Sequence, residues 1–392
     1  MHTPSGIKTP YYLYNLDVLH RTLQAALAAA GNYGYHIHYA LKANHNPVIT
    51  DIISNYGFGA DCVSGNEVTE ALHRGFPAQK VVFAGVGKSD EEIQHALEND
   101  ILCFNCESVE ELQIISQIAE ECQKVAAVAL RVNPHVQAQT HKYITTGLEE
   151  NKFGIQLSRL QEALELCRQS QWIDFKGLHF HIGSQIMSMQ PFEELCRKVN
   201  HIWQKFRIDE YNPVMLNLGG GLGVDYSNPD VLPDFENFFS HIARNLAIPS
   251  HIKVHFELGR SLVAQCGSLI TKVLYTKEGN QKDFVIADAG MTELMRPALY
   301  QAVHKIENIT SEGAPALYDV VGPICESSDV FAKNIALPLT RRGDLLAVKS
   351  CGAYAESMML RYNMRGRAHS YFVGDGQISG NSCREEAEAT VQ

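Results

Sequence analysis

The stretch that decides the fold runs from residue 80 to residue 133 and reads KVVFAGVGKSDEEIQHALENDILCFNCESVEELQIISQIAEECQKVAAVALRVN. Short apolar runs, typical of buried strands, alternate here with segments whose apolar residues recur at helical spacing. The strand-like runs are 80–86, 102–108 and 127–133, and the clearest helical segment is 109–122. Ser89 stands where a helix-capping residue is expected. The stretch therefore predicts successive strand–helix units.

The same alternation continues on both sides of this stretch. Five further strands are expected at 37–43, 58–64, 175–183, 214–221 and 252–259, and helices at 191–206 and after Ser158. Parallel strands need helical crossovers, and eight of them close a sheet. The pattern predicts an α/β protein with a (β/α)8 TIM-like barrel, and a doubly wound open sheet is the alternative.

Beyond about residue 265 the sequence pattern changes from alternating strands and helices to successive strands. Strand-like runs separated by turn residues follow one another there, at 268–275, 283–288, 317–322 and 344–351. They predict a mostly antiparallel C-terminal β domain, to which TPYYLYN (9–15) can add a strand. We expect the barrel over 27–264 and the β domain over 1–26 with 265–392. The insertion 134–157 is expected to be a functional loop, and the polar tail after 374 partly disordered.

Composition excludes several classes of protein. The 392 residues include 33 Lys and Arg against 44 Asp and Glu, a net charge of −11, which argues against nucleic-acid binding. No run approaches the roughly 20 apolar residues of a membrane span, and no signal peptide is recognisable. Cys103 and Cys106, the only closely spaced pair among ten cysteines, are interpreted as part of a buried strand rather than a redox or metal site. We expect a cytoplasmic protein without a bound metal.

The unusual residues fall at the predicted carboxyl ends of the barrel strands, where barrel enzymes place their reactive groups. They are Lys42, Asp61, His181, the run GGGLG at 219–223, Glu257, Gly259 and Arg260. A lysine inside a strand that is buried on both faces is costly, and a desolvated lysine suits covalent attachment of an aldehyde cofactor. A glycine-rich turn suits a phosphate.

Each of these residues also has an ordinary structural interpretation. The glycines can form a tight turn, His181 can be a core histidine, and Glu257 can pair with Arg260. Together, however, a lysine, a phosphate loop, a flat ring and a carboxylate match the needs of pyridoxal 5′-phosphate. A carboxylate against the pyridine nitrogen keeps that nitrogen protonated and strengthens the electron sink.

Eight motifs resemble, in order, those of the diaminopimelate decarboxylase family, the barrel-type (fold type III) pyridoxal-phosphate decarboxylases. They are YALKAN, GADCVSGNE, GLHFHIGSQ, NLGGGLGVDY, FELGRSLVA, DAGMTELMRPALY, GPICESSD and GAYAESMMLRYNMR, and they span essentially the whole chain. One departure is Leu258, where the family usually has proline, which affects backbone stiffness rather than a reacting group.

The resemblance implies cofactor and substrate roles residue by residue. Lys42 would hold the cofactor covalently, His181 would stack on its ring and Glu257 would face its pyridine nitrogen. The remaining cofactor-binding residues would be Asp61, Ser184, Gly220, Gly221, Gly259, Arg260 and Tyr354. Substrate would be bound by Arg260, Arg296, Tyr300, Glu326 and Tyr354. Cys325, as the proton donor, and Glu326 would enter the site from the second subunit of a homodimer, in which the β domain completes the active site.

The implied reaction is decarboxylation of meso-2,6-diaminopimelate to L-lysine and CO2, the last step of lysine biosynthesis. Two arginines and a glutamate match a substrate with a carboxylate and an amine at each end. The alternatives are a decarboxylase of ornithine, arginine or a polyamine precursor and, in a different class, a non-catalytic pyridoxal-phosphate carrier. An alanine-racemase-like enzyme would be expected to carry arginine, not Glu257, at the pyridine nitrogen.

Overall fold

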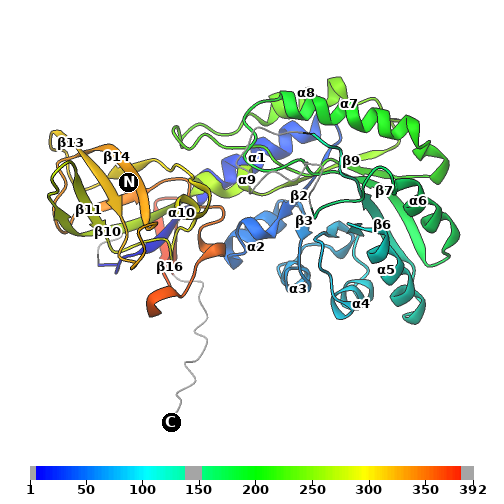
Figure 1. Ribbon diagram of the computed structural model, residues 1–392, viewed down its shortest axis with the longest axis horizontal. Coiled ribbons are helices and arrows are strands. Elements are labelled where there is room, and N and C mark those ends of the chain that lie inside the picture. Colours follow the sequence, from blue (N-terminus) through cyan, green and yellow to red (C-terminus); the bar gives the residue numbers. More distant parts are fainter. Residues whose placement is uncertain (1–5, 137–151, 381–392) are drawn as a thin grey trace, which may run out of the picture. The chain divides into compact units, whose positions relative to one another are not determined.

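The computed structural model of the chain describes residues 6–136 and 152–380 (Figure 1). Two compact units make up the chain: Leu23–Gly223 with Pro233–Gly259, and Met1–Thr22 with Val224–Leu232 and Arg260–Gln392. We call them the barrel unit and the sheet unit. Most of the 134–157 insertion and the extreme tail, 381–392, lie outside the described residues.

The barrel unit is a closed ring of eight parallel strands. Its strands are β2 (His36–Ala40), β3 (Gly59–Cys62), β4 (Val81–Phe83), β5 (Cys103–Cys106), β6 (Ala126–Arg131), β7 (Ile173–His179), β8 (Met215–Asn217) and β9 (Lys253–Leu258). β2 pairs in parallel with both β3 and β9, so the sheet has no free edge. The predicted barrel is confirmed, and the open doubly wound sheet is excluded.

A helix that precedes β2 and the helices between the barrel strands form the outer layer (Figure 1). They are α1 (Leu16–Gly31), α2 (Pro47–Asn55), α3 (Gly65–His73), α4 (Asp90–Glu98), α5 (Val109–Glu121), α6 (Leu160–Gln169), α7 (Gln190–Lys205) and α8 (Phe235–Asn245). Ser89 caps α4 in a capping box with Glu92, as the sequence predicts. The helix expected after Ser158 begins only at Leu160, and its N-cap residue is Arg159 without a side-chain cap.

The barrel strands are shorter than the apolar runs that predict them, and this difference determines where Lys42 and His181 lie. The run 37–43 ends as a strand at Ala40, and a short 3-10 turn, Leu41–Ala43, carries Lys42. The run 175–183 ends at His179, so His181 lies in the loop that follows. Lys42 and His181 therefore lie just past the ends of β2 and β7, whereas Asp61 and Glu257 lie in the last residues of β3 and β9.

The sheet unit is mostly antiparallel, as the sequence predicts. It contains β1 (Tyr11–Asn15), β10 (Gly267–Lys277), β11 (Asp283–Ala287), β12 (Ile306–Asn308), β13 (Pro315–Val321), β14 (Val330–Pro338), β15 (Leu345–Val348), β16 (His369–Gly374), β17 (Gln377–Gly380) and the short helices α9 (Arg260–Val263) and α10 (Arg296–Tyr300). β1 pairs antiparallel with β10 and parallel with β16, which confirms that TPYYLYN supplies a strand to this unit.

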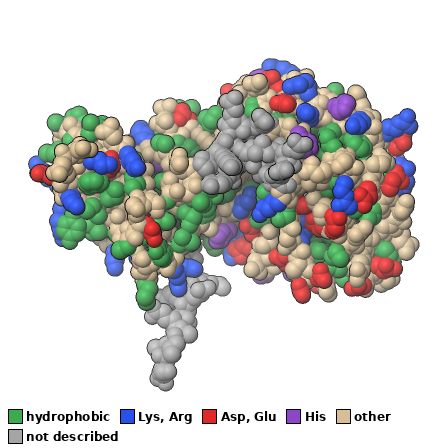
Figure 2. Space-filling model, viewed as in Figure 1, with side chains coloured by type: hydrophobic (Ala, Val, Ile, Leu, Met, Phe, Trp, Pro, Cys, Tyr) green, Lys and Arg blue, Asp and Glu red, His purple; other side chains and the backbone are tan. Residues whose placement is uncertain are grey.

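The surface of the barrel unit mixes acidic and basic side chains on the visible face (Figure 2). Within residues 6–136 and 152–380, no helix has the length and apolar character needed to cross a membrane. Cys103 and Cys106 are both buried within β5, and neither is in a disulfide. Their interpretation as strand residues is therefore confirmed.

Candidate functional site

Lys42 meets a buried carboxylate at the mouth of the barrel. Its Nζ lies 3.1 Å from Oδ2 of Asp61, which stands in β3 and is fully buried. The Lys42 side chain itself is 38% exposed, so the expectation of a buried lysine is wrong. The reason is the early end of β2 at Ala40, which puts Lys42 on a turn rather than inside the sheet. The amine thus stays accessible to a ligand while one carboxylate orients it.

The Asp61 carboxyl group is well placed to exchange a proton with this amine. Burial raises the pKa of Asp61 to about 7, and the charge of Glu257 acts in the same direction, while Lys42 opposes both. Its other oxygen, Oδ1, has no hydrogen-bond partner in the described part of the chain. A carboxyl group that is only partly satisfied and titrates near neutrality is typical of functional sites.

Glu257, near the end of β9, is held by three side chains from three other strands. Asn105 of β5 and Asn217 of β8 donate to its Oε1 at 2.8 and 2.7 Å. His179 of β7 lies with Nε2 3.1 Å from Oε2. Buried carboxylates need such partners, because an unsatisfied charge in the interior is costly. We call Asn105, His179 and Asn217 the glutamate cradle.

His179 and Lys42 keep Glu257 ionised despite its burial. Burial alone would raise the pKa of Glu257, but its interactions with His179 and Lys42 hold that pKa below its usual range. An ionised carboxylate accepts a charge-assisted hydrogen bond from a protonated ring nitrogen, which is stronger than the bond that a protonated carboxyl group can accept. The site therefore offers a fixed negative charge to a ligand that carries a positive one.

His181 is a neutral ring whose orientation is fixed by backbone. Its desolvation, with the nearby positive charges of Arg131 and Lys42, holds its pKa well below the usual range. Gly220 donates its N–H to His181 Nδ1 at 3.2 Å. In the neutral ring this places the proton on Nε2. The Gly220 amide, which the sequence analysis assigned to a phosphate, points instead to the histidine in this structure.

The glycine run fits tightly between neighbouring loops. A Cβ at Gly220 would lie 1.9 Å from the carbonyl oxygen of Glu257, and one at Gly221 would lie 2.8 Å from that of Gly183. Gly221 also has a φ of +116°, which side-chain-bearing residues rarely adopt. Gly259, directly after β9, has somewhat more space: a Cβ there would lie 3.0 Å from the Cβ of Ala43 and 3.1 Å from that of Ala40. These residues bring backbone close to the same region of the mouth.

A cavity of about 460 Å³ opens beside Lys42, His181 and Glu257. Its lining includes Lys42, His179, His181, Glu257, Arg131 and Phe153. Arg131 pairs with buried Glu107 at 2.5 Å and its guanidinium lies 4.8 Å over the Phe153 ring. Ser184 lies half-buried in the loop after β7, two residues before the Ile186 bridge to Leu222. The volume is that of a small-molecule site.

In the sheet unit, two buried arginines meet at one tyrosine. Arg260 donates from Nη1 to the Tyr226 hydroxyl at 2.8 Å, and the Arg296 guanidinium lies 4.8 Å over the Tyr226 ring. Arg296 is hydrogen-bonded at 2.8 Å to His304, and Nε of Arg296 has no partner among the described residues. Burial lowers the pKa of His304 to about 3, so this partner is neutral. Arg296 thus has no ion-pair partner in the described part of the chain.

Tyr300 and Tyr354 accompany these arginines. Tyr300 stands four residues after Arg296 on α10, which puts both on one helical face. Tyr354 lies under the guanidinium of Arg260 at 4.7 Å and has a left-handed backbone with φ +55°. This backbone conformation is uncommon in residues other than glycine.

Cys325 and Glu326 lie on an exposed loop of the sheet unit. The Tyr362 hydroxyl donates to Glu326 at 2.8 Å, and the Cys325 N–H donates to the Asn363 side chain at 3.2 Å. Met364, next along that segment, is 99% exposed. This loop of the sheet unit therefore presents a thiol and a carboxylate at the surface, beside a fully exposed methionine.

Comparison with known proteins agrees with this geometry. A family model for the pyridoxal binding domain of pyridoxal-dependent decarboxylases matches residues 16–264. A diaminopimelate decarboxylase of Bacteroides thetaiotaomicron is 51% identical over 368 residues, which cover 93% of this chain and 95% of that protein. The chain belongs to the diaminopimelate decarboxylase family.

Solved structures place the family's fold over nearly the whole chain. Diaminopimelate decarboxylase from Helicobacter pylori, in complex with L-lysine, is 39% identical with a TM-score of 0.91, covering 96% of this chain and 94% of that one. The M. jannaschii enzyme, also in complex with L-lysine, is 34% identical with a TM-score of 0.88, covering 94% and 88%. A lysine/ornithine decarboxylase of Vibrio vulnificus, at 23% identity, shares the fold.

Sequence reasoning missed the glutamate cradle. It left His179 outside the site and considered CFNC only for its cysteines, although Asn105 is the residue of that motif that contacts Glu257. Asn105 and Asn217 are polar residues in otherwise apolar strands, and His179 is a buried polar residue at the end of β7, and that was the available signal. Their common target became visible only once the barrel closed.

Proposed function

We propose that this protein decarboxylates meso-2,6-diaminopimelate to L-lysine and CO2 with bound pyridoxal 5′-phosphate, as the last step of lysine biosynthesis. The observation that carries the proposal is the ionised Glu257 beside Lys42 and His181, in a chain that is 51% identical to a diaminopimelate decarboxylase. A negative charge held at this place is what a protonated pyridine nitrogen requires.

The residues of the barrel mouth fit this cofactor on three observations. Lys42 is accessible and oriented by Asp61, Glu257 is ionised and buried, and the glycines at 220, 221 and 259 leave room where a Cβ would collide with other atoms. When bound, pyridoxal phosphate supplies an electron sink for the bond that breaks. Lys42 would hold it covalently, and backbone at Gly221, Gly259 and Arg260 with Ser184 would hold its phosphate.

The protein's own groups would then do the following. His181 would stack on the ring, while Glu257 would hold a proton at the ring nitrogen. Asp61, with its pKa raised to about 7 by burial, would exchange a proton with Lys42. Cys325 would donate the proton that replaces the departing carboxylate on the reacting carbon.

The arginines of the sheet unit would bind carboxylate. A buried guanidinium whose neighbour is a neutral histidine retains its full charge, and a carboxylate is the group that satisfies it bidentately. We assign Arg260, Arg296 and Tyr300 to substrate carboxylate, Tyr354 to both cofactor and substrate, and Glu326 to the distal amine. A monocarboxylate such as ornithine or arginine carries no distal carboxylate for such a site.

We further propose a homodimer in which Cys325 and Glu326 serve the site of the other subunit. The support is their position on an exposed loop beside Tyr362 and Met364, 45% and 99% exposed. Large exposed apolar side chains of this kind favour burial by a partner. We place the protein in a reducing compartment such as the cytoplasm, since the described cysteines are free.

The experiment that tests the proposed function is CO2 release by the cofactor-loaded protein, with meso-diaminopimelate, ornithine, arginine and lysine supplied side by side. We expect turnover on diaminopimelate alone. Turnover on ornithine or arginine would overturn the assignment of Arg296 to a distal carboxylate, and absence of turnover on all four would favour a cofactor carrier.

A further inference from the structure

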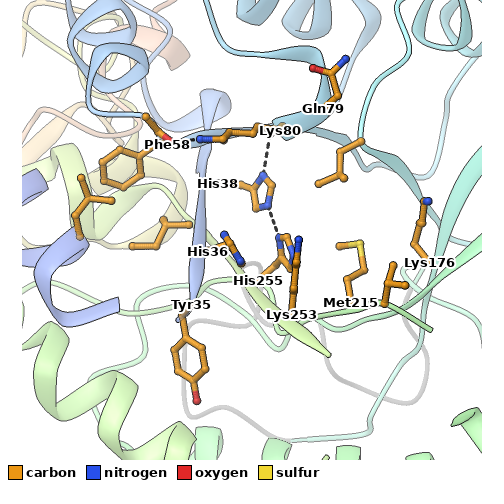
Figure 3. Close-up of a pocket in the computed structure, with 16 residues that line it drawn as sticks. Tyr35, His36, His38, Phe58, Gln79, Lys80, Lys176, Met215, Lys253 and His255 are labelled. Carbon is orange, nitrogen blue, oxygen red and sulfur yellow. Dashed lines mark hydrogen bonds between the residues drawn. The ribbon is translucent and has the colours of Figure 1, made fainter. Parts of the chain in front are cut away.

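A second cavity lies at the opposite end of the barrel, among the first residues of the strands (Figure 3). Its volume is about 360 Å³, within the range of small-molecule sites. The polar part of its lining consists mainly of His36, His38, Lys80, Lys176, Lys253 and His255. In barrels this end usually serves stability and is filled by branched apolar side chains. The three histidines and three lysines here therefore call for a different explanation.

The charge of this cavity is positive. Three lysines line it and no acidic residue does. Lys80 donates to the backbone carbonyl of Gly57 at 2.9 Å, which leaves its charge unneutralised, whereas Lys176 is paired with Asp174 at 2.5 Å. Lys253 has no ion-pair partner in the described part of the chain and lies beside His255 (Figure 3). A concave surface with one sign of charge concentrates ions of the other sign.

The histidines form a fixed chain of hydrogen bonds. His38 Nδ1 lies 3.0 Å from the carbonyl oxygen of Lys80, and its Nε2 lies 2.8 Å from His255 Nδ1. Because the carbonyl only accepts, His38 donates to it, and His255 in turn donates to His38. Burial lowers the pKa of His38 to about 4 and that of His255 to about 2, so both rings are neutral. The positive charge at neutral pH thus belongs to the lysines.

A glycine leaves room for this chain of hydrogen bonds. A Cβ at Gly59 would lie 2.3 Å from His38 Nδ1 and 2.5 Å from the Lys80 carbonyl oxygen, so only glycine admits both. His36 stacks on His255 with ring centroids 4.8 Å apart and an interplanar angle of 26°. Histidine rings in place of aliphatic side chains reduce the apolar surface buried at this end of the barrel, which lowers the stability of the fold. A binding role for the rings would explain why they are present.

The remaining lining is apolar and partly aromatic. Phe58, Leu102, Val214 and Met215 contribute to it, and Val214 is 50% exposed at the cavity. A ligand that fits this cavity needs an anionic group to contact Lys253 and Lys80 and a flat or aliphatic body to contact the apolar side chains. We propose that this cavity binds a small organic anion, in which a phosphate or carboxylate group is carried on an apolar body.

Isothermal titration calorimetry of the cofactor-loaded protein tests this proposal. The probes are phenyl phosphate, benzoate and inorganic phosphate, of which the first two distinguish a phosphate from a carboxylate ligand. We expect saturable binding of at least one of the two aromatic anions, at one site per chain and tighter than that of inorganic phosphate. Its affinity should fall as salt is added, because screening weakens the attraction to the lysines.

Two variants and a matched control locate the site. Lys253→Met removes the charge, and Val214→Trp fills the cavity without changing its charge. Each should weaken binding about tenfold, as expected for the loss of one charge contact or of the space for the ligand. Lys272→Met, the same change at an exposed lysine of β10, should leave the affinity unchanged.

Three outcomes would overturn the proposal. One is the absence of saturable binding of either aromatic anion at millimolar concentration. Another is binding that Lys253→Met and Val214→Trp leave intact. The third is binding that is lost in Arg296→Leu but kept in Lys253→Met, which would assign the anion to the substrate arginines instead. The measurement reads binding alone, so it stands apart from the test of the decarboxylation.

Discussion

Glu257 owes its charge to neighbours rather than to solvent. It is 6% exposed, and its two oxygens receive hydrogen bonds from Asn105, Asn217 and His179. A hydrogen bond to a charged group contributes about 1.5–3 kcal/mol, so three of them offset a substantial part of the cost of burial. At the scale of single residues, the site therefore holds a buried carboxylate with a stabilised charge, which we propose accepts a hydrogen bond from a protonated ring nitrogen.

Changing His179 should move the pH dependence of activity. Glu257 has a depressed pKa, so activity that needs its charge is present above that pKa and is lost as the pH falls through it. His179→Leu removes its foremost stabilising partner, so the acid limb of kcat should move to higher pH. We expect kcat at neutral pH to fall about 10- to 100-fold, the equivalent of one charged hydrogen bond.

The control for this prediction is His179→Gln, which keeps an amide donor at the position and should recover part of the loss. Bound cofactor is measured by its visible absorbance in both variants, so that a change in kcat is separated from a change in loading. An unchanged acid limb in His179→Leu would contradict a role through Glu257.

Lys42 should be required for the visible absorbance of the bound cofactor. Lys42→Ala removes the amine that Asp61 orients, so the absorbance of the covalently attached cofactor should disappear and activity should fall by several orders of magnitude, on the order of a lost covalent step. Lys124→Ala, at a lysine paired with Asp100, is the matched control and should keep both. An unchanged spectrum in Lys42→Ala would exclude it as the point of attachment.

At the scale of elements, the lengths of the strands set the geometry of the mouth. β2 ends at Ala40 and β7 at His179, and the chain then turns so that Lys42 and His181 lie at the same cavity. The loop after β8 packs its glycines directly against the β9 backbone, with no space for a side chain at Gly220. The region that we propose for the phosphate is thus built by backbone that only glycine allows to approach so closely.

Gly220→Ala should damage this loop. A Cβ there would lie 1.9 Å from a backbone oxygen of Glu257, so strands or loop must shift. We expect a loss of about 1–3 kcal/mol in the free energy of unfolding and at least about tenfold weaker cofactor binding. Urea denaturation and cofactor titration measure the two.

Gly31→Ala is the matched control, because Gly31 ends α1 with nothing within 4 Å of a Cβ and has no left-handed backbone. It should change the free energy of unfolding by less than about 0.5 kcal/mol. Equal stability and equal cofactor affinity in Gly220→Ala and Gly31→Ala would contradict the tight packing of the glycine run.

At the scale of the whole molecule, the residues that we propose for the reaction come from both units. Lys42, Asp61, His181 and Glu257 belong to the barrel unit, whereas Arg296, Cys325 and Glu326 belong to the sheet unit. A dimer that exchanges Cys325 and Glu326 between subunits makes a specific prediction about mixtures of inactive variants, since each site then draws on both chains.

Mixing Lys42→Ala with Glu326→Ala subunits should restore activity. In a mixed dimer, one site receives both substitutions and the other receives neither, so one site in two is intact. With random exchange of equal amounts, half of the dimers are mixed, which gives about a quarter of wild-type activity. The restored activity is measured as CO2 release before and after subunit exchange. An inactive mixture that contains verified mixed dimers would mean that each site is built within one chain.

The barrel, the added strand of the sheet unit and the cofactor class could all be predicted from sequence, because they depend on local signals. Apolar periodicity along 80–133 indicates alternating strands and helices whatever their tertiary contacts. Motifs such as YALKAN can be recognised from consecutive residues alone. The capping of α4 by Ser89 is equally local. The beginning of α6 was misjudged by one residue, since element boundaries depend weakly on any one residue.

Two features of the site depended on tertiary structure. The exposure of Lys42 follows from where β2 stops pairing with its neighbours, which the apolar run 37–43 does not reveal. The glutamate cradle joins β5, β7 and β8 to β9, strands that are far apart in the chain and whose inward residues meet only when the sheet closes in one register. Periodicity tells which faces are buried, but closure of the barrel decides which buried polar groups become partners.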